Sequence, residues 1–322
     1  MAQLTLPVID LSGAGTDDHA ARVESEIRAA FENVGVAYLV GHDVPPDMID
    51  GMLVNTRAFF HQPLPTKLRA AADPPSRYRG YCSAEDSVPA GVTPPELWES
   101  FEFNRFDAPE EAVAAGCSER AATLLKPNLW PDEPLRFHDI TRGYFGAVER
   151  LMYQFLGHCA RALGLESDWF VSRFTPHCSY LSLNYYPPQL TPPQATQLRQ
   201  VPHTDIAGPT FLYQDGSEGG LEIQAPDGTW APVPHRPGAF VVFMSDLMAR
   251  WTNDRWKSTL HRVVNPPSTA AGTDRVSLAY FSYPNLDTLV DVVPTCRDAV
   301  GGTGYEPVVA VDWVLKRMGR PG

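Results

Sequence analysis

Between residues 180 and 283 the hydrophobic pattern has a period of two, and this limits the possible folds more than any other feature of the chain. Eight short segments rich in β-branched and aromatic residues are separated by turn residues, and Asp227-Gly228 predicts a tight hairpin turn. The segments are residues 180–186, 198–203, 210–213, 221–225, 229–233, 239–244, 259–264 and 275–283. Eight strands of this kind predict two packed antiparallel sheets, which is the jelly-roll arrangement.

Helical patterns flank these strands. Residues 133–163 carry a wide apolar stripe with the helical period, and they predict a helix about 45 Å long that lies across a sheet. Residues 73–126 predict loops with one or two short helices. The remaining expected elements are strands at 6–11 and 36–40, helices at 16–33 and from Pro46, and a short outer helix at 311–318.

We therefore expect a mainly β protein with flanking helices. Its expected parts are a mixed α/β N-terminal region with the backbone helix (residues 1–165), a jelly-roll domain (175–285) and a tail that packs on the core (286–322).

Charge and composition exclude several classes of partner. Hydrophobic residues make up 43% of the 322-residue chain and charged residues 20%, as in globular proteins. The net charge of −12 argues against nucleic acid and anionic membranes, and no apolar run approaches the roughly 20 residues of a membrane span. The N-terminal segment does not resemble a signal peptide, and the five cysteines lack CxxC spacing, so we expect a cytoplasmic protein with reduced thiols.

The strand region contains a candidate metal site. His203 and Asp205 are two residues apart, a spacing that puts both side chains on one face of a strand, about 7 Å apart. With His261 they supply two imidazoles and one carboxylate, the ligand set of non-haem Fe(II) oxygenases, which leaves coordination positions open. The alternative is a polar turn at His203 and Asp205 and a core histidine at His261. The additional pair Arg275-x-Ser277 favours the metal site.

Arg275 and Ser277 form a candidate anion site beside the metal. A guanidinium binds a carboxylate through two hydrogen bonds, and a serine hydroxyl adds a third. The alternative is a surface arginine on an edge strand. However, Val276 and Leu278 make this strand largely apolar, and an unpaired arginine there would be costly. A bound dicarboxylate would remove that cost.

Together with the segments around them, these candidate site residues resemble, in their order along the chain, the motifs of the Fe(II)- and 2-oxoglutarate-dependent dioxygenases of the isopenicillin N synthase-like family. The resemblance rests on Leu183-Asn184-Tyr185-Tyr186-Pro187-Pro188, His203-Thr204-Asp205, Lys257-Ser258-Thr259-Leu260-His261-Arg262-Val263 and Arg275-Val276-Ser277-Leu278-Ala279-Tyr280-Phe281. N-terminal motifs such as Pro7-Val8-Ile9-Asp10-Leu11 and Arg79-Gly80-Tyr81 extend it to the family's N-terminal region, at about residues 5–125.

This resemblance implies a double-stranded β-helix, a form of the jelly roll, and a site with defined roles. It implies that His203, Asp205 and His261 bind Fe(II), and that Arg275 and Ser277 hold the distal carboxylate of 2-oxoglutarate. Asn184 and Tyr186 correspond to further co-substrate contacts, although Tyr186 is equally well explained as a core aromatic. The implied reaction uses O₂ and 2-oxoglutarate, forms succinate and CO₂, and hydroxylates or desaturates a small molecule, in specialised metabolism.

Selection of the substrate is expected from loops around the barrel mouth. Candidate contacts are Arg77, Arg79, Tyr81, Glu102 and Phe281, against the simpler interpretation of solvated arginines and a packed phenylalanine. The primary substrate stays open, as does the choice among hydroxylation, desaturation and ring closure. We expect a monomer or a weak homo-oligomer.

Three other functions compete with this hypothesis. An oxidase of the same family performs oxidative cyclisation without 2-oxoglutarate, but Asn184-x-Tyr186 favours a co-substrate. A non-catalytic binding protein has no need for an open metal face. A zinc hydrolase needs a general base, which the spacing does not place.

Overall fold

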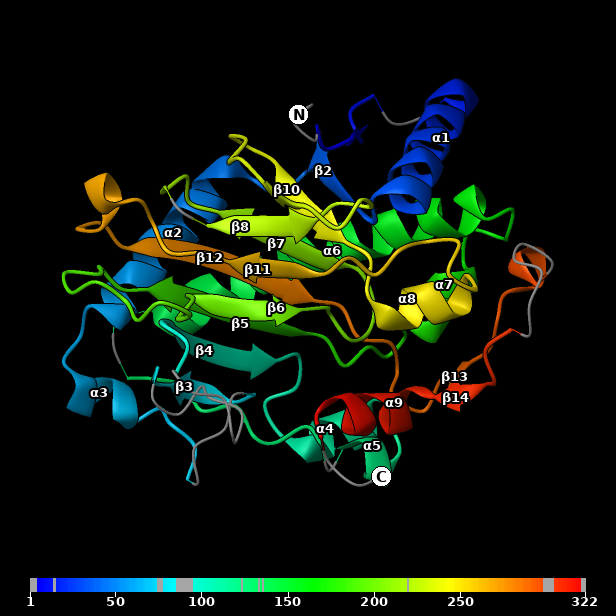
Figure 1. Ribbon diagram of the computed structural model, residues 1–322. Coiled ribbons are helices and arrows are strands. Elements are labelled where there is room, and N and C mark those ends of the chain that lie inside the picture. Colours follow the sequence, from blue (N-terminus) through cyan, green and yellow to red (C-terminus); the bar gives the residue numbers. More distant parts are fainter. Residues whose placement is uncertain are drawn as a thin grey trace.

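Two sheets face each other in the computed structural model, which describes residues 5–13, 16–73, 78–84, 95–122, 124–132, 134, 136–218, 220–297 and 304–319 (Figure 1). The large sheet has eight strands in the order β1-β2-β10-β7-β12-β5-β4-β3, and the small sheet has four in the order β6-β11-β8-β9. The strands of the large sheet are β1 (Val8–Asp10), β2 (Val36–Val40), β3 (Gly80–Cys82), β4 (Glu99–Asn104), β5 (Tyr180–Tyr186), β7 (Thr210–Gln214), β10 (Phe240–Phe243) and β12 (Arg275–Phe281). Those of the small sheet are β6 (Gln200–His203), β8 (Leu221–Gln224), β9 (Trp230–Pro232) and β11 (His261–Val263).

The eight strands expected from the sequence divide equally between the two sheets. Strands β10, β7, β12 and β5 form the centre of the large sheet, and β6, β11, β8 and β9 form the small one. The jelly-roll core is therefore confirmed, and β1 and β2 on one side and β4 and β3 on the other widen its large sheet. The expected hairpin turn joins β8 to β9, where Gly228 has a φ of 83° that glycine adopts readily.

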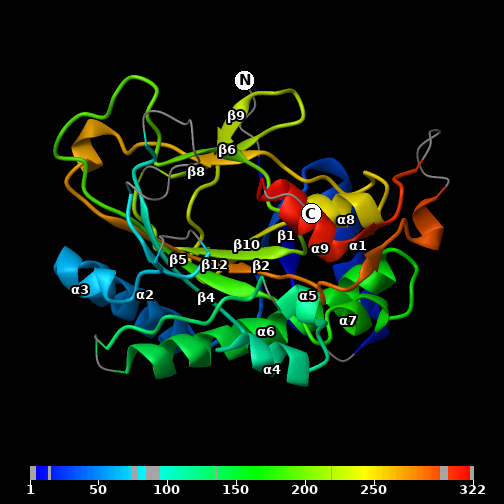
Figure 2. The ribbon, with the colours of Figure 1, turned by 90° about the horizontal axis from the view of Figure 1, so that it is seen from below.

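Helices cover the side of the large sheet that faces away from the small sheet (Figure 2). The longest is α6 (Phe137–Ala162), whose Phe145 and Phe155 lie against β12 and β7: their ring centroids are 5.0 Å from Tyr280 and 5.5 Å from Phe211. The other helices are α1 (Asp17–Asn33), α2 (Pro46–Phe60), α3 (Leu64–Leu68), α4 (Pro109–Ala114), α5 (Glu119–Ala122), α7 (Trp169–Arg173), α8 (Asp246–Trp251) and α9 (Ala310–Arg317). Two 3₁₀ turns (Ser268–Ala270 and Pro294–Cys296) and the short pair β13 (Leu289–Val290) and β14 (Val308–Val309) complete the described elements.

Alternation along β5 and β12 separates an apolar face from a polar one. On the helix-covered face, Leu181, Leu183 and Tyr185 of β5 join Val276, Leu278 and Tyr280 of β12 in the main core. Successive side chains of a strand point to opposite faces, so the residues between them face the small sheet. The register pairs Tyr186 with Arg275, Asn184 with Ser277 and Ser182 with Ala279.

Two expectations need correction. The region 73–126 contains the short helices α4 and α5, but it also contains β3 and β4, because Phe101 and Phe103 alternate into the main core while β4 pairs with β5. The long helix begins at Phe137 rather than at 133, because Arg136 has a left-handed backbone, with φ of 66°, that does not continue a helix.

No helix in the described ranges combines the length and the apolar character that crossing a bilayer requires.

Gly35, in the turn between α1 and β2, provides a test of how closely this turn packs against the segment that contains Lys257 and Thr259. Its φ is 78°, and a Cβ atom there would lie 2.3 Å from both the Lys257 carbonyl oxygen and Thr259 Oγ1. Gly35→Ala should therefore lower the free energy of unfolding by about 2–4 kcal/mol, through backbone strain and steric overlap. Gly51→Ala in α2 is the control: its Cβ would meet nothing within 4 Å, so stability should rise by about 0.5–1 kcal/mol in urea unfolding. Equal effects of the two substitutions would contradict this packing.

Candidate active site

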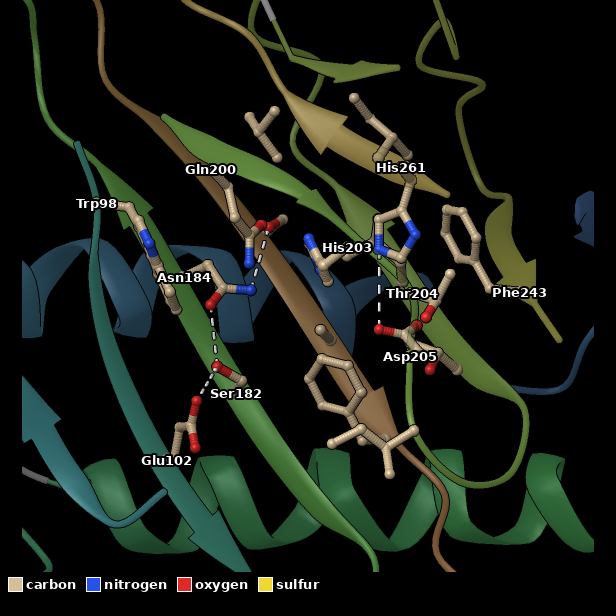
Figure 3. A pocket seen from close by; sticks show the side chains of 18 of the residues that line it. Trp98, Glu102, Ser182, Asn184, Gln200, His203, Thr204, Asp205, Phe243 and His261 are labelled. Atoms are coloured by element: carbon tan, nitrogen blue, oxygen red, sulfur yellow. Dashed lines mark hydrogen bonds and ion pairs between the residues drawn. The ribbon is translucent and has the colours of Figure 1, made fainter. Parts of the chain in front are cut away.

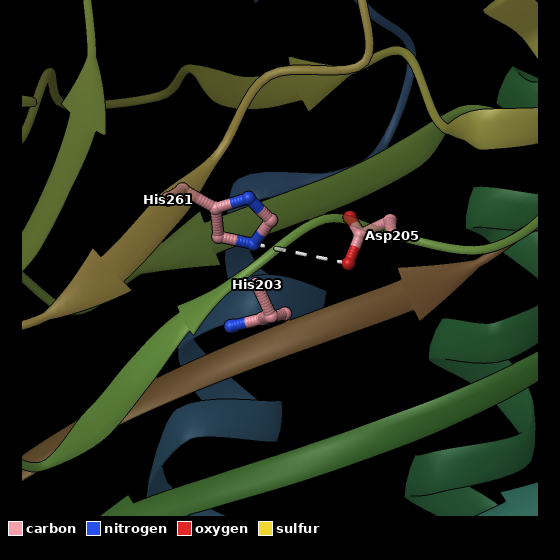
Figure 4. Close-up of side chains that lie close together, drawn as sticks. All are labelled: His203, Asp205 and His261. Atoms are coloured by element: carbon pink, nitrogen blue, oxygen red, sulfur yellow. Dashed lines mark ion pairs between the residues drawn. The ribbon is translucent and has the colours of Figure 1, made fainter. Parts of the chain in front are cut away.

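Three side chains of types that could hold a metal ion, His203, Asp205 and His261, converge between the two sheets (Figure 4). His203 ends β6, His261 begins β11, and the two residues are directly paired in the small sheet. Asp205 lies two residues beyond the end of β6, in a loop rather than on the strand, and its backbone carbonyl accepts a hydrogen bond from the Asp246 amide at 3.0 Å. One ligand atom from each of the three residues lies within 4.8 Å of the others. This geometry allows the three side chains to share one ion.

Hydrogen bonds to the backbone orient both imidazoles. Nδ1 of His203 lies 2.9 Å from the Val201 carbonyl oxygen, and Nδ1 of His261 lies 3.1 Å from the Thr259 carbonyl oxygen. A carbonyl only accepts, so each Nδ1 carries the proton and each Nε2 keeps a lone pair for a metal. Burial, with a further contribution from His203, lowers the pKa of His261 to about 4 and keeps that ring neutral.

The carboxylate of Asp205 fits a bound cation. Its side chain is buried, and Oδ2 has no hydrogen-bond partner in the described part of the chain. Oδ1 lies 3.8 Å from Nε2 of His261, which is too far for a hydrogen bond. A buried carboxylate oxygen without a partner is costly, and a divalent ion between it and the two imidazoles would remove that cost.

Arg275 is a buried cation at the other end of the same inner face. Its residue is 1% exposed, and Nη2 donates to Gln214 Oε1 at 3.0 Å. Among the described residues, Nη1 has no hydrogen-bond partner and no carboxylate lies within 4.0 Å of the guanidinium. The nearby Asp215 and Asp274 carboxylates pair instead with Arg57. The arrangement fits a small anion that enters from outside the protein, such as a dicarboxylate.

The surroundings of Arg275 hold its guanidinium in place. Tyr186 lies beside it, with 4.8 Å between Cζ and the ring centroid. Gly220 lets the side chain approach closely, because a Cβ there would lie 3.0 Å from Nε of Arg275. Arg199, four residues before His203, is fully buried and lies 5.6 Å from the same ring. Burial, followed by the charge of Arg275, lowers the pKa of Arg199 to about 10.

A row of hydrogen-bonded side chains crosses the floor of the site from β4 to β12 (Figure 3). The Ser182 hydroxyl lies 2.9 Å from Asn184 Oδ1 and 3.0 Å from Glu102 Oε1, and its single proton is shared between these two acceptors. Asn184 Nδ2 in turn lies 3.5 Å from Ser277 Oγ, so the amide donates to that hydroxyl. Because Ser277 accepts this hydrogen bond, its own hydroxyl proton stays available to an acceptor beside Arg275.

The three-residue cluster and Arg275 line one cavity, whose volume is about 280 Å³. Of the five residues expected to contact substrate, Glu102 and Phe281 line this cavity, and Phe281 stacks on Tyr180 at 4.8 Å. Arg79 lies at a smaller second cavity, and its Nε donates to the Lys126 carbonyl oxygen at 2.8 Å. The Tyr81 hydroxyl donates to Glu99 Oε2 at 2.7 Å, away from the site. Arg77 lies outside the described residues.

Arg317 of α9 also lines the cavity, although no sequence pattern indicates it. Its Nη2 donates to Thr204 Oγ1 at 3.0 Å, between the two residues of the His-x-Asp pair, and its Nε lies 2.8 Å from Asp246 Oδ2. Asp246 also accepts a hydrogen bond from Ser258 at 2.7 Å. Only tertiary folding brings residue 317 next to residue 204, so no local pattern signals this contact.

Comparison with known proteins agrees with this geometry. A family model for the N-terminal region of the non-haem dioxygenase in morphine synthesis matches residues 6–133, and one for the 2OG-Fe(II) oxygenase superfamily matches residues 177–284. Validamycin A dioxygenase of Streptomyces hygroscopicus subsp. limoneus is 29% identical over 320 residues, covering 97% of this chain and 86% of the relative. Proline hydroxylase buaE of Petromyces alliaceus is 32% identical over 275 residues, covering 81% of each chain. A full-length Neurospora crassa protein, whose crystal structure is in complex with alpha-KG (2-oxoglutarate), superposes with a TM-score of 0.83 at 26% identity, covering 98% and 96% of the two chains.

The fold, the His-x-Asp and His cluster and these matches place the chain among the Fe(II)- and 2-oxoglutarate-dependent oxygenases. Within them it belongs to the isopenicillin N synthase-like dioxygenase family, whose N-terminal region it also contains. Its cofactors are therefore Fe(II) and 2-oxoglutarate, as the sequence resemblance implied.

The absence of a counter-charge for Arg275 among the described residues gives a test that needs no ligand. Arg275→Met removes a buried cation that has no acidic partner there, so the free energy of unfolding without cofactors should stay constant or rise by about 1–2 kcal/mol. Arg57→Met leaves the buried Asp215 without its cation and Asp274 with only the His61 imidazole, and should lower the free energy of unfolding by about 2–4 kcal/mol. Urea unfolding of both variants measures this difference. A loss for Arg275→Met as large as that for Arg57→Met would show that Arg275 already has a partner.

Proposed function

We propose that this enzyme oxidises a C–H bond of a small polar molecule, by hydroxylation or desaturation, in specialised metabolism. The observation that carries the proposal is that one cavity joins a three-residue metal cluster to a buried arginine for which the described residues supply no counter-charge. Two relatives, a validamycin A dioxygenase and a proline hydroxylase, support a small-molecule substrate.

In this proposal His203, Asp205 and His261 bind Fe(II), with the two Nε2 atoms and one carboxylate oxygen as ligands. Bound Fe(II) supplies the oxygen activation that couples conversion of 2-oxoglutarate to succinate and CO₂ with substrate oxidation. The carbonyls of Val201 and Thr259 hold the two imidazoles in the metal-binding tautomer.

Arg275 and Ser277 bind the distal carboxylate of 2-oxoglutarate in the same proposal. Nη1 of Arg275 and the Ser277 hydroxyl are the donors that the surrounding described residues leave available. Asn184 fixes the Ser277 hydroxyl, and Tyr186 supports the guanidinium from beside it. The cavity then orients the co-substrate with one end at the arginine and the other toward the metal cluster.

Glu102 and Phe281 are the proposed substrate contacts, because both line the cavity and neither belongs to the proposed metal or 2-oxoglutarate ligands. Arg317, paired with Asp246, also lines the cavity and places a guanidinium beside Thr204. A carboxylate, an aromatic ring and a guanidinium around one cavity suit a substrate with several polar groups.

We also propose a cytoplasmic enzyme that acts as a monomer or a weak homo-oligomer, without nucleic acid or membrane partners. None of the five cysteines, all of which are described, forms a disulfide, which supports a reducing compartment. The formal net charge of −12 supports the exclusion of polyanionic partners.

Removing one proposed metal ligand should abolish both binding and turnover. Anaerobic addition of Fe(II) and 2-oxoglutarate to the wild type should give a visible charge-transfer band, and candidate substrates should stimulate succinate release. His261→Ala should lose the band and lower succinate formation by about a hundredfold or more. His235→Ala, at an exposed histidine that does not line the cavity, is the control and should behave as the wild type. Normal turnover by His261→Ala contradicts the ligand assignment, and substrate oxidation without 2-oxoglutarate would indicate the oxidase instead.

The role of Arg275 in co-substrate binding has its own test. Arg275→Met should raise the Kd of 2-oxoglutarate about thirtyfold or more, because losing one partner of a buried charged contact costs about 2–5 kcal/mol. Titration of the visible band, or calorimetry with Mn²⁺ in place of iron, measures the change. Ser277→Ala should give a smaller increase, since it removes one hydrogen bond. An unchanged Kd for Arg275→Met would place the distal carboxylate elsewhere.

A further inference from the structure

Two of the five cysteines form a sulfur pair outside the active site. Sγ of Cys117 and Sγ of Cys178 are 3.8 Å apart, although the residues are 61 positions apart in the chain. Cys117 lies between α4 and α5, and Cys178 lies just before β5. Both are buried, at 4% and 3% exposure. Neither Cys159 nor Cys296 has such a sulfur neighbour among the described residues.

The backbone on both sides of the pair is well anchored. The Cys117 amide donates to the Ala112 carbonyl oxygen at 2.9 Å, and the Cys178 amide donates to the Tyr283 carbonyl oxygen at 3.2 Å. Next to Cys117, the Ser118 amide donates to Asp287 Oδ2 at 2.7 Å, which ties this connection to the segment after β12. The two thiols are thus held near each other by the fold and do not depend on chance encounter.

Small oxidants have two routes to the pair. Cys117 lies directly beneath the surface, because its chain neighbours Gly116 and Ser118 are both exposed. Cys178 lines a second cavity, of about 60 Å³, whose wall includes Tyr180 and Tyr283. The same two tyrosines line the active-site cavity, so the second cavity adjoins the place where oxygen is used.

The sulfur contact shifts the pKa values of the two thiols in opposite directions. A hydrogen bond between the two sulfur atoms lowers the pKa of Cys117, while burial and the Asp287 charge oppose that shift. The pKa of Cys178 is raised by the same sulfur contact and by burial. A thiolate is the reactive form of cysteine, and a neighbouring thiol is the group that resolves its first oxidation product.

We propose that Cys117 and Cys178 are an oxidation-sensitive pair that hydrogen peroxide converts into an internal disulfide. The Cys117 thiolate attacks one peroxide oxygen, the O–O bond breaks, and the released hydroxide takes a proton to form water. Cys178 sulfur then attacks the Cys117 sulfenic acid, an S–S bond forms, and the second oxygen leaves as water with the Cys178 proton. In sum, two thiols and one peroxide give one disulfide and two waters.

The disulfide would link the loop between α4 and α5 to the segment just before β5. An S–S bond is about 2.05 Å long, so the sulfur atoms must approach each other from 3.8 Å. Cys178 is two residues before Tyr180, whose ring stacks on Phe281 in the active-site wall. Oxidation is therefore positioned to affect the shape of the active-site cavity through β5.

The experiment treats the full-length protein, kept free of iron by a chelator, with a small excess of hydrogen peroxide. Peptide mapping without reduction should find one cross-linked species that contains Cys117 and Cys178, with the mass of two hydrogens lost and reversed by dithiothreitol. This pair should react about tenfold faster or more than Cys82, Cys159 and Cys296. Cys159→Ala is the control, because its buried sulfur has no such neighbour among the described residues, and it should leave the cross-link unchanged.

Two variants distinguish a pair from two independent thiols. In Cys178→Ser the first oxidation product on Cys117 has no resolving thiol, so dimedone should trap a sulfenic acid there. In Cys117→Ser peroxide should leave Cys178 largely reduced. The proposal is overturned if the wild type forms no cross-link while other cysteines are oxidised, or if all five thiols react at the same rate. None of these readouts depends on the catalytic activity.

Discussion

The antiparallel pairing of β5 with β12 is the constraint on which the site depends. Its register sets Arg275 opposite Tyr186 and Ser277 opposite Asn184. Because the alternate residues of both strands are packed into the core against the helices, a shift by one residue would bury the polar row and expose the apolar one. The hydrophobic core that stabilises the large sheet therefore also fixes the geometry of the anion site.

The small sheet contributes the opposite wall and two of the three proposed metal ligands. Pairing of β6 with β11 brings His203 and His261 together. Hydrogen bonds from Nδ1 to backbone carbonyls determine the tautomer of each ring. Two buried groups, Oδ2 of Asp205 and Nη1 of Arg275, have no partner in the described part of the chain. They have opposite charges and their residues line one cavity, an arrangement that fits a cation at one end and an anion at the other.

Local pattern predicted much of this architecture but not all of it. β5 was predicted with its observed bounds because tyrosines and leucines alternate there with polar residues, and spacing alone placed Arg275 and Ser277 on one face. β4 was missed because prolines and charges surround it, and because its inner face is polar at Ser100 and Glu102. Contacts between distant segments, such as Arg317 with Thr204, leave no periodic signal in the chain. Such contacts are set by the packing of whole elements.

The most direct test of this account is a crystal structure with Mn²⁺ in place of iron and with 2-oxoglutarate, using anomalous diffraction to locate the metal. We expect one strong anomalous peak at bonding distance from Nε2 of His203, Nε2 of His261 and a carboxylate oxygen of Asp205. We expect the distal carboxylate of 2-oxoglutarate on Nη1 of Arg275 and the Ser277 hydroxyl. A peak away from these three ligands, or a co-substrate that leaves Arg275 without a partner, would contradict the central claim.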